Sequence, residues 1–257
     1  MKKTFFVTNN YHRMVEGIEA LKNREPSLHG LGLIYGRWGW GKSETVEYYY
    51  GQSNAYYVRA ARLWTPRDLL EAVCDELQIL PEYRTVSRFN QVCKELRRRK
   101  EPLIIDEADY LFKRDIHLDV IRDIHDISRV PIVLVGMEQA LAKLERYGQF
   151  WSRILPAGIV EFKPLSPPEM TLVTREWTGL DMEPESAEEL CRMTEGDFRL
   201  VAGCLEELEK ACRVNKKTAI NLPMIKAVKR KIIARKKVIT SQRKDHVKQI
   251  YSVGRGK

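Results

Sequence analysis

The sequence has no long hydrophobic run. A membrane-spanning helix needs about 18–20 consecutive apolar residues, and no stretch of this 257-residue chain approaches that length. The N-terminal stretch turns polar at Thr8, so no secretory signal is expected. Five cysteines are scattered along the chain, an odd number without close pairs or metal-ligand spacing. These absences predict a soluble protein in the reducing cytoplasm, without a membrane partner.

Acidic residues are nearly missing from the C-terminal end. Residues 213–257 contain 15 Lys or Arg and a single acid, Asp245, which gives a net charge of +14. The whole chain carries +9, so residues 1–212 carry −5. A basic segment of this kind contacts nucleic acid or an acidic partner, or it is a solvated helix that keeps the protein soluble. Charge alone leaves both interpretations open.

Short apolar runs alternate with segments of helical periodicity. Strand and helix in alternation predict an α/β fold, a parallel sheet with helices on both faces. Two of the runs, Leu103–Ile105 and Ile132–Val135, are apolar throughout, which is typical of central strands buried on both sides. The five expected strands are Leu31–Tyr35, Ala55–Arg59, Pro102–Asp106, Pro131–Val135 and Gly158–Phe162.

Several predicted helices begin at capping residues. Thr65 precedes a proline and an aspartate, and both Ser166 and Ser186 stand three residues before a glutamate, as in a capping box. Asn221 is a further N-cap candidate, which opens a helix into the basic tail. Only helices are expected from residue 166 to residue 214. The pattern predicts an α/β domain over residues 1–165, a small helical domain over 166–215, and a basic helix and tail over 216–257.

The strongest motif follows the first expected strand. Residues 36–43 read GRWGWGKS, which matches the phosphate-loop pattern G-x-x-x-x-G-K-[ST] between a strand and a helix. Glycines let backbone N–H groups turn towards phosphate oxygens, and the following helix directs its positive end at the same anion. Lys42 would supply positive charge to the terminal phosphates, and the Ser43 hydroxyl would ligate Mg²⁺. The residues expected to hold the nucleotide are Gly36, Gly39, Trp40, Gly41, Lys42, Ser43 and Glu44.

Two acids end the third expected strand, about 60 residues further along the chain. Asp106 would hold the Mg²⁺ through a water molecule, and Glu107 would orient or deprotonate the attacking water as a general base. The alternative is a helix N-terminus that happens to carry two acids. Because the same chain has a phosphate loop, we expect catalytic residues here, with ATP and Mg²⁺ as the ligands.

Other polar residues carry less specific signals. Arg153 precedes the last expected strand and Arg199 lies in the helical domain; each either stabilises charge on a transferring phosphoryl group or is structural. His117 and His125 lie among aspartates on an expected helix, but their spacing is not that of a metal-ligand pair, which disfavours a metal site. The run Arg97–Lys100 ends a helix, where cations suit the dipole, and we interpret it as structural.

The phosphate loop, the Asp-Glu strand end, the Ser-Arg pair before the fifth strand and the Gly-x-x-Arg of the helical domain resemble AAA+ ATPases. More narrowly, residues 8–212 resemble transposition regulators of the MuB and TnsC type. The resemblance implies a five-stranded AAA+ P-loop NTPase fold with a helical lid. It also implies a slow ATPase, stimulated by DNA or a partner, that forms filaments or rings on double-stranded DNA, selects target DNA and activates a transposase. Arg153 would then act in trans on the ATP of a neighbouring subunit, and Arg199 in cis as the sensor of the lid.

The chain departs from the family at one position. These ATPases place a small polar residue at the end of the fourth strand, where this chain has Gly136 and Met137. Either Glu138 substitutes for that residue or hydrolysis is slow. The resemblance also places DNA contacts in the basic segment between the second and third strands. The candidates there, each of which also fits an ordinary surface arginine, are Arg62, Arg84 and Arg88.

Two other functions fit the same motifs. A helicase loader or replication initiator on the same fold would differ in its partner, which would be a hexameric helicase in place of a transposase. A nucleotide-gated DNA-binding scaffold would bind ATP with little turnover, and steady-state phosphate release would separate it from a true ATPase.

Overall fold

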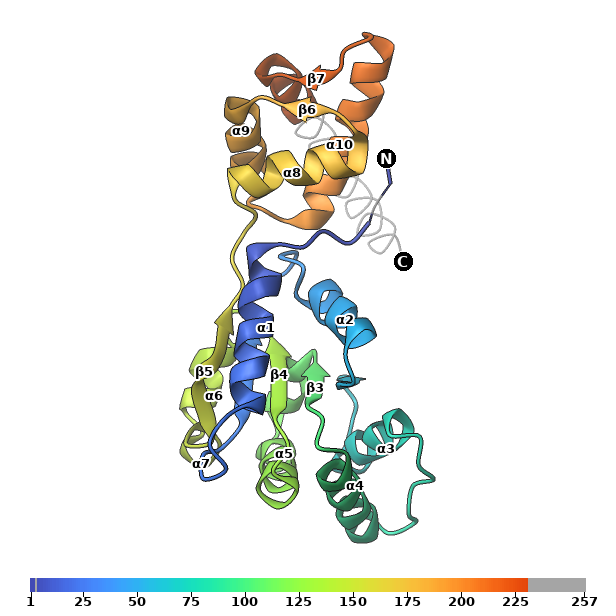
Figure 1. Cartoon of the computed structure of the whole chain (residues 1–257), viewed down its shortest axis with the longest axis vertical. Coiled ribbons are helices and arrows are strands. Elements are labelled where there is room, and N and C mark those ends of the chain that lie inside the picture. Colours follow the sequence, from blue (N-terminus) through green and yellow to red (C-terminus); the bar gives the residue numbers. More distant parts are fainter. Residues whose placement is uncertain (3, 231–257) are drawn as a thin grey trace, which may run out of the picture. The chain divides into compact units, whose positions relative to one another are not determined.

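The computed structural model describes residues 1–2 and 4–230, which form two compact units (Figure 1). Residues 5–164 make up the first unit, and the second comprises the residues from 165 onwards together with the N-terminal ones up to Thr4. Within this described part, no helix combines the length and the apolar character that crossing a bilayer requires. Most of the basic tail, residues 231–257, lies outside the described residues.

The first unit is built on five parallel strands in the order β2-β3-β4-β1-β5. Their bounds are β1 (Leu31–Tyr35), β2 (Tyr56–Arg59), β3 (Leu103–Asp106), β4 (Ile132–Gly136) and β5 (Ile154–Glu161). The predicted α/β fold with a five-stranded parallel sheet is confirmed, and the first four strands lie within one residue of their expected bounds. Strand β1, which leads into the phosphate loop, lies inside the sheet between β4 and β5.

Strand β5 is longer than predicted. It begins at Ile154, which pairs with Leu31, whereas the apolar pattern indicated a start at Gly158. Pro156 interrupts that pattern, and a proline cannot donate to a sheet ladder. Because β5 is an edge strand, the missing donor is tolerated. The register shifts after the first pair, and β5 rejoins β1 from Ile159 onwards.

Both faces of the sheet are buried, and successive residues of β3 point to opposite faces. Ile104 packs with α1 (Asn9–Lys22) and α2 (Lys42–Gln52). Leu103 and Ile105 pack on the other face, which is covered by the larger group of helices (Figure 1). That group comprises α3 (Pro66–Glu76), α4 (Thr85–Arg99), the 3₁₀ helix η1 (Ala108–Lys113), α5 (Asp115–Ser128), α6 (Ala140–Glu145) and α7 (Gly148–Trp151). Burial on both sides accounts for the unbroken apolar runs of β3 and β4.

The second unit is mostly helical. It contains α8 (Pro167–Thr178), α9 (Pro184–Thr194) and α10 (Phe198–Val214), and a further helix runs from residue 222 to the last described residue, 230. The prediction that residues 166–214 hold only helices was wrong, because β6 (Asp181–Met182) pairs in parallel with β7 (Ala219–Ile220). A strand of two residues is too short to show the alternation of apolar and polar residues by which strands are found.

Three of the four predicted helix caps are present. Reciprocal capping boxes join Thr65 to Asp68 and Ser166 to Glu169, and the Asn221 side chain accepts from Met224 N at 3.4 Å. The cap predicted at Ser186 was wrong: Ser186 lies inside α9, which begins two residues earlier at Pro184. A proline at the first helical position has the φ of a helix already, and it fixes that earlier start.

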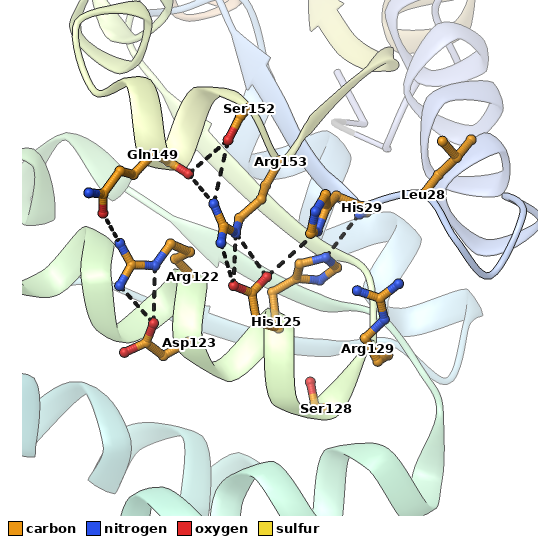
Figure 2. Close-up of polar contacts among 12 residues, drawn as sticks. Leu28, His29, Arg122, Asp123, His125, Ser128, Arg129, Gln149, Ser152 and Arg153 are labelled. Carbon is orange, nitrogen blue, oxygen red and sulfur yellow. Dashed lines mark hydrogen bonds and ion pairs between the residues drawn. The ribbon is translucent and has the colours of Figure 1, made fainter.

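His125 joins three segments at the amino edge of the sheet. The side chain is fully buried on α5, and its Nδ1 lies 2.8 Å from the Val130 carbonyl oxygen. Its Nε2 lies 3.0 Å from Gly30 N, a contact drawn in Figure 2. Because the Gly30 N–H must donate, Nε2 is the acceptor and Nδ1 carries the proton. Burial lowers the pKa of His125 to about 4, so the imidazole is neutral in the folded protein near pH 7.

We expect His125 to make the fold less stable in mild acid. Its ordinary pKa is about 6.5, so between that value and the lowered folded one the unfolded chain binds a proton that the folded chain excludes. Stability that is fully present above about pH 6.5 is therefore lost as the pH falls, by about 3 kcal/mol in all. Denaturant unfolding from about pH 7.5 to about pH 4.5 measures the loss. His125→Gln should flatten this dependence, whereas the exposed His12→Gln should retain it; the opposite pattern would contradict the assignment.

Candidate nucleotide-binding site

The phosphate loop lies at the carboxyl end of β1. Gly39 and Gly41 have φ angles of 80° and 81°, a left-handed region that residues with a side chain rarely adopt. At Gly36 a Cβ would come within 2.9 Å of the Phe162 carbonyl oxygen, so only glycine lets the loop pass that strand end. Gly41, the N-cap of α2, has no side chain with which to cap the helix. The first N–H groups of α2 therefore suit an anion such as a phosphate.

Lys42, the first residue of α2, folds back over this loop. Its Nζ donates to the carbonyl oxygens of Gly36 at 2.7 Å and of Arg37 at 3.0 Å. Burial lowers the pKa of Lys42, and the negative charges of Asp106 and Asp109 oppose that shift. The ammonium group thus binds the loop carbonyls and is attracted by the charges of Asp106, which ends β3, and of Asp109 in η1. A phosphate would attract it more strongly than two neutral acceptors do.

Asp106 ends β3 and is almost fully buried, with 2% of its surface exposed. Its Oδ2 accepts from the Tyr57 hydroxyl at 3.1 Å, and its Oδ1 accepts from Glu107 N at 2.7 Å. Burial and then the Asp106 charge raise the pKa of Tyr57, so the hydroxyl keeps its proton and remains a donor. Carboxylate and hydroxyl oxygens are ligands that Mg²⁺ prefers, so Asp106 and Ser43 have the chemistry for that ion.

Glu107 follows the strand in a left-handed conformation, with φ of 53°, which is uncommon for a residue with a side chain. Its Oε1 lies 3.4 Å from Nη2 of Arg59, at the end of β2. The two side chains are 57% (Arg59) and 34% (Glu107) exposed, so the ion pair is weak and exchanges readily with water.

Sequence reasoning missed Tyr57 and Arg59 as neighbours of the two acids. Strands β2 and β3 pair in parallel, with Arg59 opposite Asp106 and Tyr57 opposite Ile104. Because residues two apart in a strand share a face, this register brings both side chains to the acids. The alternation of Tyr57 and Arg59 was visible in the sequence, but the pairing of their strand with β3 was not.

The end of β4 has no room for a side chain at Gly136. A Cβ there would lie 2.9 Å from Oδ2 of Asp109, which belongs to η1. The same Oδ2 accepts from Met137 N at 2.5 Å, and Oδ1 lies 3.3 Å from Nζ of Lys143. A carboxylate from another segment thus takes the place where the resembled ATPases have a small polar residue. Glu138, the substitute suggested by the sequence, is exposed.

The two candidate phosphate-stabilising arginines have very different surroundings. Arg153 lies just before β5 and binds Asp126 of α5, with Nε 2.9 and 2.8 Å from the two carboxylate oxygens and Nη2 2.8 Å from Oδ2. Arg199 belongs to the second unit, where it is exposed on the first turn of α10. A cation in the first turn of a helix is unfavourable beside the positive end of the helix dipole, so Arg199 does not stabilise α10 through that dipole.

Of the three candidate DNA contacts, Arg62 and Arg84 are exposed and Arg88 is not. The structure contradicts the prediction for Arg88, which is only 3% exposed. Its guanidinium donates to the Glu71 carboxylate at 2.7 Å and to the Glu82 carbonyl oxygen at 3.0 Å. Arg88 faces α3 from the inner side of α4 and holds the loop between these helices, so it is not available to a ligand.

We expect Arg88→Met to lower the free energy of unfolding by about 1–3 kcal/mol, because it removes the donor to the Glu82 carbonyl oxygen and the partner of the Glu71 carboxylate. Arg84→Met makes the same change at an exposed arginine one turn earlier and should stay within about 0.5 kcal/mol of the original protein. Urea unfolding of both variants measures the difference. Equal stabilities would mean that the Arg88 contacts do not hold the loop.

Within the described residues, His29, His125 and Asp126 bring possible metal-ligand atoms within 4.8 Å of one another. Both ring nitrogens of His125 are already bonded to backbone groups, and Asp126 is bonded to Arg153. A metal would have to break these contacts and would gain His29 as its one uncommitted ligand. His117, the other histidine considered from the sequence, is not part of the group. The geometry therefore disfavours a metal here.

Cations at the amino edge of the sheet line a cavity of about 500 Å³. The Arg97 Nε donates to the Ile127 carbonyl oxygen at 3.0 Å, and the Arg24 Nη1 donates to the Leu21 carbonyl oxygen at 2.6 Å. These carbonyls belong to the last turns of α5 and α1, where a carbonyl oxygen has no N–H partner within its own helix. The arginines thus complete helix ends, in agreement with the structural interpretation of Arg97–Lys100.

The first unit contains a match to a known protein family. Residues 24–144 match a family described as the AAA domain. A potential ATP-binding protein of Staphylococcus aureus is 26% identical over 140 residues, which are 51% of this chain and 50% of that protein. This chain therefore spans about half the length of that relative.

Solved structures share the fold at low identity. The Orc1 protein of Aeropyrum pernix in complex with DNA has a TM-score of 0.58 at 16% identity, over 87% of this chain and 64% of that one. Cdc6p of Pyrobaculum aerophilum has a TM-score of 0.55 at 17% identity, over 82% and 62%. The RuvB Holliday junction branch migration motor of Thermotoga maritima has a TM-score of 0.54 at 20% identity, over 86% and 67%. Together with the phosphate loop and the five-stranded parallel sheet, the family match shows that residues 24–144 belong to an AAA-type P-loop ATPase domain.

Proposed function

We propose that this chain is an ATPase that assembles into filaments or rings on double-stranded DNA, selects target DNA, and recruits and activates a transposase. The observation that supports the proposal most strongly is the carboxyl edge of the sheet. There the charge of Asp106 acts on the Lys42 ammonium, and the left-handed glycines of the neighbouring loop suit backbone contacts to phosphate. The transposition part rests on the motif resemblance to the MuB and TnsC type.

In the proposed reaction, Lys42 leaves its loop carbonyls and binds the terminal phosphates of ATP. Mg²⁺, held by Ser43 and Asp106, would supply further positive charge to the phosphate oxygens. Glu107 exchanges Arg59 for the attacking water and takes its proton as the oxygen bonds to the γ-phosphorus and ADP leaves. Because the ion pair between Glu107 and Arg59 is weak, this exchange has a small energetic cost.

The segment between β2 and β3 supports the DNA-binding part. Arg62 and Arg84 are exposed there, and the Arg67 guanidinium lies 5.8 Å from the centre of the Tyr83 ring, which keeps the loop before α4 beside the start of α3. Arginines suit contacts to the phosphate backbone, which carry no sequence preference. The same segment also exposes four large apolar side chains, Leu63, Leu80, Tyr83 and Val86. Exposed apolar side chains are available for contact with a partner.

Assembly would complete the site. We propose that Arg153 acts in trans on the ATP of the neighbouring subunit and that Arg199 senses the nucleotide in cis. Residues 1–212 carry a net charge of −5, so one subunit offers DNA only a local basic patch. Many such patches aligned by ATP-dependent assembly would bind the duplex strongly, because phosphate contacts add along the strand. The basic tail would add contacts that do not depend on ATP.

A replication initiator or helicase loader is the second candidate. Orc1 and Cdc6p share this fold, and the Orc1 structure is a complex with DNA. This likeness supports the proposal that this chain binds DNA. The two candidate functions differ in the partner protein, which would be a transposase in the first and a hexameric helicase in the second. A third candidate is a nucleotide-gated scaffold with little turnover, which the carboxylate at the end of β4 favours because it offers no donor to a phosphate.

We expect Glu107→Gln to bind ATP but to hydrolyse it at least about 100-fold more slowly, because the amide keeps the shape of the side chain and cannot take a proton. Glu145→Gln makes the same change on the exposed side of α6 and should hydrolyse ATP at the original rate. Steady-state phosphate release and binding of a fluorescent ATP analogue measure the two steps. Hydrolysis by Glu107→Gln at the original rate would show that the base lies elsewhere, and negligible turnover in the unmodified protein would favour the scaffold.

We expect negative-stain images to show filaments or rings on duplex DNA with ATP and only dispersed particles with ADP. Joint replacement of Arg62 and Arg84 by alanine should abolish these assemblies and leave ATP binding intact, because it removes phosphate contacts of the segment between β2 and β3. Joint replacement of Arg175 and Arg192, two exposed arginines of the second unit, is the control. Assemblies that form on a hexameric helicase and not on DNA would favour the helicase loader instead.

A further inference from the structure

Every nitrogen of the Arg153 guanidinium already has a partner within its own chain. Nε and Nη2 donate to the Asp126 carboxylate. Nη1 donates to the Gln149 carbonyl oxygen at 2.5 Å and to the Ser152 hydroxyl at 3.4 Å (Figure 2). The side chain is 24% exposed. An arginine that acts on the ATP of another subunit must give up part of this set first.

Asp126 is the charged member of the set, and a second group shares it. Its Oδ1 lies 3.6 Å from Nδ1 of His29, in the segment between α1 and β1. This Nδ1 is buried and has no hydrogen-bond partner within the described residues. The Asp126 carboxylate therefore lies between a permanent cation and a titratable ring that is ready to take its place.

We propose that Asp126 is a positioning residue that holds Arg153 back in the free subunit, and that His29 binds the Asp126 carboxylate when Arg153 is released to a neighbouring subunit. The inference rests on the trans role proposed above for Arg153. Both members of the ion pair are partly exposed, at 24% and 29%, so breaking it costs little. A phosphate carries more charge than one carboxylate and matches the same fork of donors, so it competes well for the guanidinium.

The charges around His29 determine how the release of Arg153 from Asp126 depends on pH. Burial lowers the pKa of His29, and the Asp126 charge acts against that shift. The cations that lower it further are Arg153, Arg129 and Arg24. The His125 ring, 5.7 Å away, is neutral and adds no charge near pH 7. When Arg153 leaves, one cation is lost and the carboxylate faces His29 alone, so the pKa of His29 rises. The released state thus binds more protons, and a lower pH favours release.

Asp126→Asn tests the holding role, because it keeps the shape and removes the charge. The protein concentration that gives half-maximal ATPase activity on DNA should fall by roughly two- to fivefold, the effect of a partly exposed ion pair. Asp123→Asn is the matched control: it lies on the same helix and its carboxylate binds Arg122 instead. It should leave that concentration unchanged. Thermal unfolding of both variants shows whether the fold is retained.

The pH arm tests the part played by His29 without disturbing the ion pair. The unmodified protein should assemble at a lower concentration at about pH 6 than at about pH 7.5. His29→Gln should match it at the higher pH and lose the gain at the lower one. Asp126→Asn should also lose the gain, because His29 then has no carboxylate to bind.

Lower activity of Asp126→Asn would overturn the inference, since Asp126 would then hold Arg153 in its active position. An unchanged concentration dependence together with an unchanged pH dependence would overturn it too. The trans role is tested separately by mixing Arg153→Ala with Lys42→Ala. Rescue, from interfaces that pair an intact loop with an intact arginine, supports that role, and failure of Asp126→Asn would then count against the inference alone. Absence of rescue, with co-assembly shown, would overturn both.

Discussion

The parallel register between β2 and β3 decides what surrounds the proposed catalytic acids. Arg59 lies opposite Asp106, and Tyr57 lies on the same face two residues earlier. A shift of this pairing by one residue would turn Tyr57 and Arg59 to the other face of the sheet and away from the acids. The same parallel arrangement gathers the ends of β1, β3 and β4 at one edge. The residues that follow these strands are far apart in the chain, and the sheet alone brings them together at this edge.

Three side chains with a proposed role at the nucleotide are bonded to other groups of their own chain in this structure. Lys42 binds carbonyls of its loop, Glu107 binds Arg59, and Arg153 binds Asp126. Each partner is neutral or at least partly exposed, so each contact is weak enough to exchange. A folded subunit can therefore be stable before it meets nucleotide or a neighbour, and the exchange of contacts can be driven by the charge of the phosphates.

The sequence allowed prediction of those features that depend on local pattern. The phosphate loop, the strands β1 to β4 and the capping boxes of α3 and α8 are each encoded within a few neighbouring residues. The early start of β5 depends on its place at the sheet edge, and the burial of Arg88 depends on how α3 packs on α4. The pair of Arg153 and Asp126 joins residues 27 positions apart on different elements. Such contacts follow from tertiary packing, which single-sequence periodicity does not contain.

The close packing of Gly136 against Asp109 constrains how proteins with this site could diversify. A side chain added at Gly136 would meet the Asp109 carboxylate, and loss of that carboxylate alone would leave the Met137 N–H without its acceptor. A lineage that acquired a polar group at the end of β4 would have to change both positions, and each single step would pass through a less stable intermediate. The effect of a change at either residue therefore depends on the other, so the two form an epistatic pair. The less stable intermediates would separate proteins with a carboxylate at this place from those with a small polar side chain.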